Sequence, residues 1–209
     1  MFSMFSPDSK IMQVISRVTD LILLNILFLM TCLPVITVGA ATAAMYTLCF
    51  RMMREEGSGV IRPYFRAFRE NFRQGTAIWL ILLLIIGPAL FYFDRVWQAD
   101  SLLRVSGLFF ILIAVAGLMT ASYVFPWISQ FQNTAAQSLQ NALILSITHL
   151  PRSLAILAIN LLPVALWALN YDLFEKISFL WLALYFAAAA YMNCGILWHV
   201  FKPYREPHE

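Results

Sequence analysis

Charged residues are scarce in this chain of 209 residues. Asp, Glu, Lys and Arg make up 12% of it, about half of the roughly 25% usual in a soluble domain. Hydrophobic residues make up 61%, and the mean hydropathy is +0.76. A soluble protein of this size cannot hide so much apolar surface, because its exterior must be largely polar. Composition excludes a soluble domain and a disordered chain, and it indicates an integral membrane protein.

Residues with recognisable chemistry are also few. The sequence has no G-x-S-x-G, H-E-x-x-H or Walker A motif and no C-x-x-C pair. Its three cysteines lie in or beside apolar runs and are expected to be free thiols: Cys32, Cys49 and Cys194. Its three histidines lie far apart: His149, His199 and His208. We therefore expect no catalytic residues, no metal site and no cofactor, and a protein that is not an enzyme.

Long apolar runs predict an all-α, polytopic helix bundle. A spanning helix needs about 20 apolar residues. Residues 21–50 form 30 residues without a charge, too long for one span and short for two. Pro34 and Gly39 interrupt this run and predict a break between two helices. A single kinked span is the alternative. With the four further runs, the sequence predicts about six spans in three hairpins within one domain, 1–209: 76–93, 105–127, 153–169 and 177–200.

Basic residues predict the orientation in the membrane, because cytoplasmic loops are enriched in Lys and Arg. Six crossings put three of these residues on one side: Arg95, Arg104 and Lys176. The other side holds eleven: Lys10, Arg17, Arg51, Arg54, Arg62, Arg66, Arg69, Arg73, Arg152, Lys202 and Arg205. We therefore expect both termini in the cytoplasm, and the bacterial cytoplasmic membrane as the location.

Three stretches have the pattern of amphipathic helices at the membrane interface, at residues 10–18, 62–73 and 133–149. The second is the clearest, because three phenylalanines repeat at helical spacing and arginines are expected on the opposite face. We predict that it contacts lipid head groups or docks a partner protein, and that it does not bind nucleic acid, through Arg62, Phe65, Arg66, Phe68, Arg69, Phe72 and Arg73.

Surface helix and hairpin follow one another three times. A threefold repeat over 1–54, 62–127 and 133–200 is one interpretation, and chance similarity among Ala- and Leu-rich helices is the other. The second helix of each hairpin carries small residues four apart, which let helix backbones approach closely in lipid. We therefore expect these three helices at the centre of the bundle.

Polar residues inside the apolar runs are the candidates for a binding site, because they are costly in hydrocarbon. One hypothesis is a polar cavity between the second helices of the hairpins, lined by Tyr46, Tyr123, Tyr191 and Asn193. The alternative is that the asparagines only hold helices together through hydrogen bonds.

Three segments together carry a family resemblance: Leu33–Tyr46 (LPVITVGAATAAMY), Arg54–Gly57 (REEG) and Tyr64–Gly75 (YFRAFRENFRQG). They resemble the YesL family (DUF624) of bacterial membrane proteins over about residues 20–80. Ala40 departs from the pattern, since many members have proline after the glycine. The resemblance implies a small protein of the cytoplasmic membrane, often encoded beside carbohydrate ABC-transporter components, glycoside-degrading enzymes and sensor kinases. It supplies no catalytic residue.

Two functions remain in competition. The first is a non-enzymatic accessory or regulatory component linked to carbohydrate uptake, with ABC-transporter or sensor-kinase subunits as partners. The second is a transporter or channel for a small solute, which requires the polar cavity.

Overall fold

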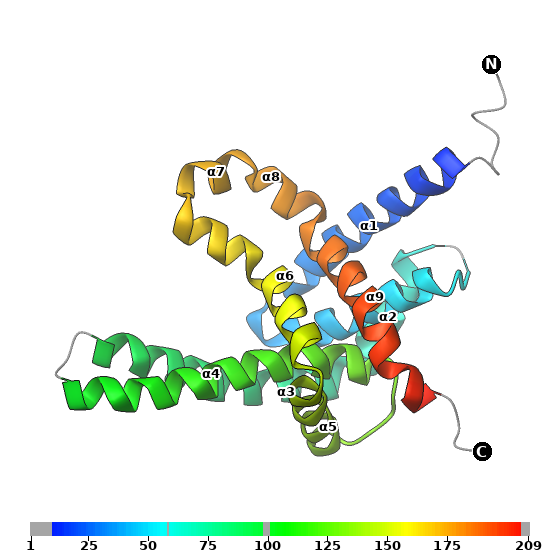
Figure 1. Cartoon of the computed structure of the whole chain (residues 1–209). Helices are drawn as coiled ribbons and strands as arrows, with labels where there is room; N and C mark the ends of the chain where they lie inside the picture. Colours follow the sequence, from blue (N-terminus) through cyan, green and yellow to red (C-terminus); the bar gives the residue numbers. More distant parts are fainter. Residues whose placement is uncertain (1–9, 58, 98–100, 206–209) are drawn as a thin grey trace.

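The computed structural model describes residues 10–57, 59–97 and 101–205, and within them every regular element is a helix (Figure 1). The elements in chain order are α1 (Lys10–Cys32), η2 (Val35–Thr37), α2 (Val38–Met53), α3 (Ile61–Trp97), α4 (Ser101–Ile128), α5 (Ala135–Thr148), α6 (Leu150–Leu169), α7 (Tyr171–Lys176), α8 (Ser178–Leu180), η3 (Trp181–Tyr185) and α9 (Phe186–Arg205). Within these residues, six helical stretches are long and apolar enough to cross a membrane. The predicted all-α bundle is confirmed.

The predicted break in the first apolar run is present at Pro34. Helix α1 ends at Cys32 and α2 begins at Val38, with the short 3₁₀ turn η2 between them. The alternative of one kinked span is therefore wrong. Gly39 is corrected as well, because it lies inside the first turn of α2 and takes no part in the break.

The amphipathic stretch 62–73 is not a separate surface helix. It forms the first third of α3, which continues without interruption to Trp97 over 37 residues. Gly75 does not break the helix, since a backbone in or near lipid keeps its hydrogen bonds by staying helical. Residues 10–18 are likewise part of α1. Only the third stretch forms its own helix, α5, which Thr134 and Gln137 cap reciprocally.

The second helix of each hairpin is the more buried one, as predicted. Within the most apolar 18 residues of each helix, 61% are buried in α2, 44% in α4 and 39% in the stretch containing α9. The first helices reach only 22%, 17% and 11%. The small residues of α2 allow this central place, and Ala40, Ala41, Ala43 and Ala44 are all fully buried. The threefold repeat itself stays a prediction.

Helices α2 and α3 touch backbone to backbone. A Cβ added to Gly39 would lie 2.2 Å from the carbonyl oxygen of Gly75, and one added to Gly75 would lie 2.9 Å from Ala40 Cα. This contact places α2 beside the first half of α3. The second half of α3 runs beside α4 as a long hairpin (Figure 1), where the Tyr92 and Phe110 rings lie 4.3 Å apart.

A π-helical turn, η3, leads into α9. Asn25 of α1 contacts both this turn and the first turn of α9. Its Nδ2 donates to Leu182 O at 2.6 Å, and its Oδ1 accepts from the backbone N–H of Ala187 at 3.0 Å. A π-turn leaves backbone groups without regular partners, so the fully buried Asn25 side chain satisfies them and fixes α1 against α9.

We predict that Gly39→Ala lowers the thermal unfolding temperature in detergent, because its methyl group would force α2 and α3 apart. Gly195→Ala is the matched control, since nothing lies within 4 Å of an added Cβ there. Alanine is favoured over glycine in a helix by ~1 kcal/mol, so the control should unfold at the same or a higher temperature. Equal unfolding temperatures for the two variants would contradict a tight crossing.

Candidate functional site

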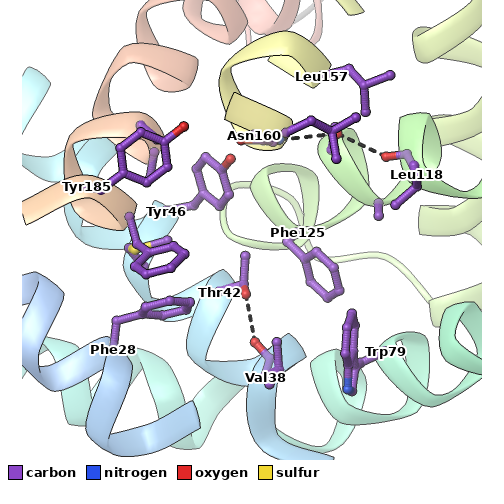
Figure 2. A pocket seen from close by; sticks show the side chains of 17 residues that line it. Phe28, Val38, Thr42, Tyr46, Trp79, Leu118, Phe125, Leu157, Asn160 and Tyr185 are labelled. Atoms are coloured by element: carbon purple, nitrogen blue, oxygen red, sulfur yellow. Dashed lines mark hydrogen bonds between the residues drawn. The ribbon is translucent and has the colours of Figure 1, made fainter. Parts of the chain in front are cut away.

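A pocket of about 370 Å³ lies where α2, α4, α6 and α9 meet. Aromatic rings form much of its wall, and Figure 2 shows Phe28, Phe125 and Trp79 around the space, with Tyr46, Asn160 and Tyr185 on its other sides. None of its 17 lining residues is charged. A ligand here would exchange water for rings and a few hydroxyl and amide groups, which suits a neutral molecule.

A chain of polar side chains borders this pocket and joins four helices. Asn193 Nδ2 of α9 donates to Tyr46 Oη of α2 at 3.2 Å and to Asn160 Oδ1 of α6 at 2.8 Å. Asn160 Nδ2 in turn donates to Ser122 Oγ of α4 at 3.3 Å. Tyr185 adds a further link by donating to the carbonyl oxygen of Ile159.

One buried atom of this chain has no partner. Asn193 is fully buried, and its Oδ1 has no hydrogen-bond partner among the described residues. A buried acceptor without a donor costs roughly 1–3 kcal/mol. The atom has almost no accessible surface, and Asn193 does not line the pocket, so Asn193 contributes to the site only through the hydrogen bonds of its Nδ2.

The predicted cavity of three tyrosines and Asn193 is only half correct. Tyr46 lines the pocket, and Asn193 donates a hydrogen bond to Tyr46. Tyr123 is buried elsewhere, where its oxygen accepts from Ser153 Oγ at 2.9 Å. Tyr191 lies near the start of α1, and its oxygen accepts from Arg17 at 3.0 Å. Similar positions in similar helices thus acquired different neighbours.

Sequence reasoning missed Ser122 and Tyr185 as lining residues. A signal for Ser122 was available, because Leu118, Ser122 and Phe125 repeat at helical spacing and all three line the pocket. No comparable signal marked Tyr185, whose direction depends on the π-turn that contains it.

Arginines also connect the ends of several helices away from the pocket lining. Arg17 of α1 donates to Met52 O, to Tyr191 Oη and to Glu55 Oε1, the last at 2.7 Å. Gln130 Oε1 accepts from Arg54 at 3.0 Å and from Arg205 at 3.1 Å, which joins the ends of α2, α4 and α9. These hydrogen bonds therefore hold the ends of α1, α2, α4 and α9 together.

The predicted docking residues form two stripes of α3. Arg62, Arg66, Arg69 and Arg73 are all exposed and share one face. That face points away from the bundle, since the opposite face buries Tyr64, Ala67 and Gly75. Phe65 and Phe72 are exposed along the side of the helix. Phe68 is half-buried and stacks on Tyr64 at 6.4 Å, so the arginines and phenylalanines are adjacent and do not lie on opposite faces.

Comparison with known families adds one match. Residues 21–95 match the family model described as "Protein of unknown function, DUF624". Over these residues the chain is similar to the DUF624 family. No curated protein and no solved structure matches the chain. The DUF624 region holds the Pro34 break, the Gly39–Gly75 contact and the whole basic stripe of α3.

The DUF624 region supplies only part of the pocket. Six of its 17 lining residues fall within 21–95: Phe28, Val38, Thr42, Met45, Tyr46 and Trp79. Ser122, Asn160 and Asn193 lie outside. Among the described residues, no group of three or more His, Cys, Asp or Glu side chains is placed to hold a metal ion.

We predict that Asn160→Leu and Asn193→Leu destabilise the bundle non-additively, because each removes the same interhelical hydrogen bond. Such bonds contribute ~0.6 kcal/mol on average and up to ~1.7 kcal/mol within membrane bundles. The measurement is a double-mutant cycle of unfolding free energies in bicelles. Asn25→Leu combined with Asn160→Leu is the control and should be additive, since Asn25 binds η3 and α9 instead. Additivity of both pairs would contradict the proposed link.

Proposed function

We propose that this protein binds a small neutral solute in the central pocket and lets it cross the membrane, without catalysing a reaction on it. The observation that carries this proposal is the pocket itself, with rings on its walls and the hydroxyl and amide groups of Tyr46, Asn160 and Ser122 among its lining residues. Its volume of about 370 Å³ falls within the usual range for small-molecule sites, roughly 300–1,000 Å³.

The neutrality of the solute follows from the lining. An ion in this pocket would lose its hydration and find no opposite charge, which is strongly unfavourable. A molecule with an apolar body and a few hydroxyl or amide groups would instead contact the rings and bind Tyr46, Asn160 and Ser122. The hydrogen bonds from Arg17 to Glu55 and from Arg54 to Gln130 hold the helix ends together around the bundle.

The test is osmotic swelling of proteoliposomes in glycerol, erythritol, xylitol and glucose. Ala121 lines the pocket, so we expect Ala121→Trp to reduce the permeability to that of protein-free liposomes. Ala116 lies on an exposed part of the same helix, and Ala116→Trp should swell as the wild type does. Wild-type permeability no greater than that of empty liposomes would refute transport of these solutes.

A second candidate is the accessory role, in which α3 docks a partner of carbohydrate uptake such as an ABC-transporter or sensor-kinase subunit. The exposed arginines of α3 favour it. Arg66 pairs with Glu70 at 2.9 Å, whereas Arg62, Arg69 and Arg73 make no ion pair among the described residues. A cytoplasmic partner with an acidic surface would complement them. The link to carbohydrate uptake rests on the family resemblance alone, as does a bacterial origin.

We predict that Phe65→Ser with Phe72→Ser releases such a partner in a mild-detergent pull-down read by mass spectrometry, because both rings are exposed. Phe68→Ser is unsuitable alone, since Phe68 packs on Tyr64 and its loss would disturb the fold. Leu84→Ser is the matched control, as this exposed residue lies farther along the same helix. Co-purified proteins unchanged by the double variant would argue against docking through this stripe.

A further inference from the structure

The turn between α1 and α2 differs from the other hairpin ends in being apolar. Leu33, Val35 and Ile36 are 83%, 62% and 55% exposed, and no charge occurs between Leu21 and Phe50. By contrast, Asp94 and Arg95 flank the end of α3, and Asp172, Glu175 and Lys176 lie in α7. Three large apolar side chains at a tip are unfavourable in water and favourable in hydrocarbon.

The length of α3 provides a scale for the membrane. Arg73 and Asp94 are the charges that bound its apolar part. They are 21 residues apart, or about 31 Å at 1.5 Å per residue, which equals the roughly 30 Å thickness of a hydrocarbon core. The outward face of α3 changes from charged to apolar at the same place. The exposed positions Arg69 and Arg73 are followed at helical spacing by the exposed Leu80 and Leu84.

Measured along α3, the α1–α2 turn lies closer to the Arg73 side of the hydrocarbon core than to the Asp94 side. Trp79 Nε1 donates to the carbonyl oxygen of Val35 at 2.7 Å, and Gly39 abuts Gly75. Trp79 is six residues beyond Arg73, or about 9 Å, and fifteen residues before Asp94, or about 22 Å. The tip therefore reaches about a third of the way from the Arg73 side to the Asp94 side.

The backbone of the turn is satisfied by side chains. Thr37 Oγ1 lies 2.5 Å from Thr31 O and 2.7 Å from Pro34 O, within donating distance of both. Thr37 N also donates to Pro34 O at 3.0 Å, and Trp79 satisfies Val35 O. Irregular backbone at membrane depth needs such internal partners, because lipid supplies none.

We infer that α1 and α2 form a re-entrant hairpin. It enters the bilayer from the side of Arg73, turns at residues 33–37 among the acyl chains of that leaflet and returns to the same side. The crossing helices are then α3, α4, α6 and the stretch containing α9. The number of crossings stays even, so both termini remain on one side, in agreement with the distribution of Lys and Arg.

The test is labelling of single cysteines by a membrane-impermeant maleimide, applied separately to spheroplasts and to inside-out vesicles. The background carries Cys32→Ser, Cys49→Ser and Cys194→Ser, which removes the three native free thiols, so that each variant holds one cysteine. Arg95→Cys and Arg69→Cys should each label from one side only, and from opposite sides. Val35→Cys should label from neither side and should label fully after denaturation.

Two results would overturn the inference. Labelling of Val35→Cys from the same side as Arg95→Cys would mean that the hairpin crosses the membrane. Labelling from the same side as Arg69→Cys would mean that its tip lies in water. Ile36→Cys repeats the test at a second exposed position, and each variant is first required to match the parent's unfolding temperature.

A nitroxide at Val35→Cys gives an independent measure of depth in nanodiscs. We expect faster relaxation by oxygen than by a water-soluble nickel chelate, and the reverse order at Arg95→Cys. A nickel-dominated signal at both positions would contradict immersion of the turn in lipid.

Discussion

The contact between the backbones of Gly39 and Gly75 is the constraint on which the rest of the molecule depends. Helices in lipid gain little from the hydrophobic effect when they associate, because lipid tails are as apolar as their side chains. They gain instead from close contact, and a contact without side chains is the closest available. This one fixes α2 against the first half of α3, brings Trp79 to Val35 and leaves the second half of α3 for α4.

Buried polar side chains then form hydrogen bonds between the helices that the small residues allow to approach. Asn25 joins α1 to the π-turn, and Asn193 joins α9 to α2 and α6. Both are fully buried, and in hydrocarbon a lost amide partner is not replaced by water. The same chain that holds the helices together also borders the pocket, so the groups that stabilise the bundle are those that a solute would meet.

Local rules predicted the features that a few neighbouring residues decide. Proline disfavours helix in the residue before it, and the break falls at Pro34. Small residues four apart marked α2, α4 and α9 as the central helices. The end of the basic segment was mispredicted, since a change from an amphipathic to an apolar pattern marks a change of surroundings and does not interrupt hydrogen bonds. Helix α3 therefore continues through it.

The candidate site was less predictable, because partners distant in sequence decide it. Tyr46, Tyr123 and Tyr191 occupy similar places in their helices, yet they bind Asn193, Ser153 and Arg17. The crossing angles of the helices determine those neighbours. Asn193 and Asn160 could be recognised as buried polar residues, but their pairing across 33 positions could not.

The uninterrupted length of α3 has a mechanical consequence. An α-helix without a break transmits displacement along its axis as a stiff rod. Arg62 at its basic end and Trp79 in the pocket wall are seventeen residues apart, or about 25 Å. A tilt imposed on the exposed end therefore moves the tryptophan as well. A force on the arginines would therefore change the shape of the pocket, because α3 would pivot at its contact with Gly39.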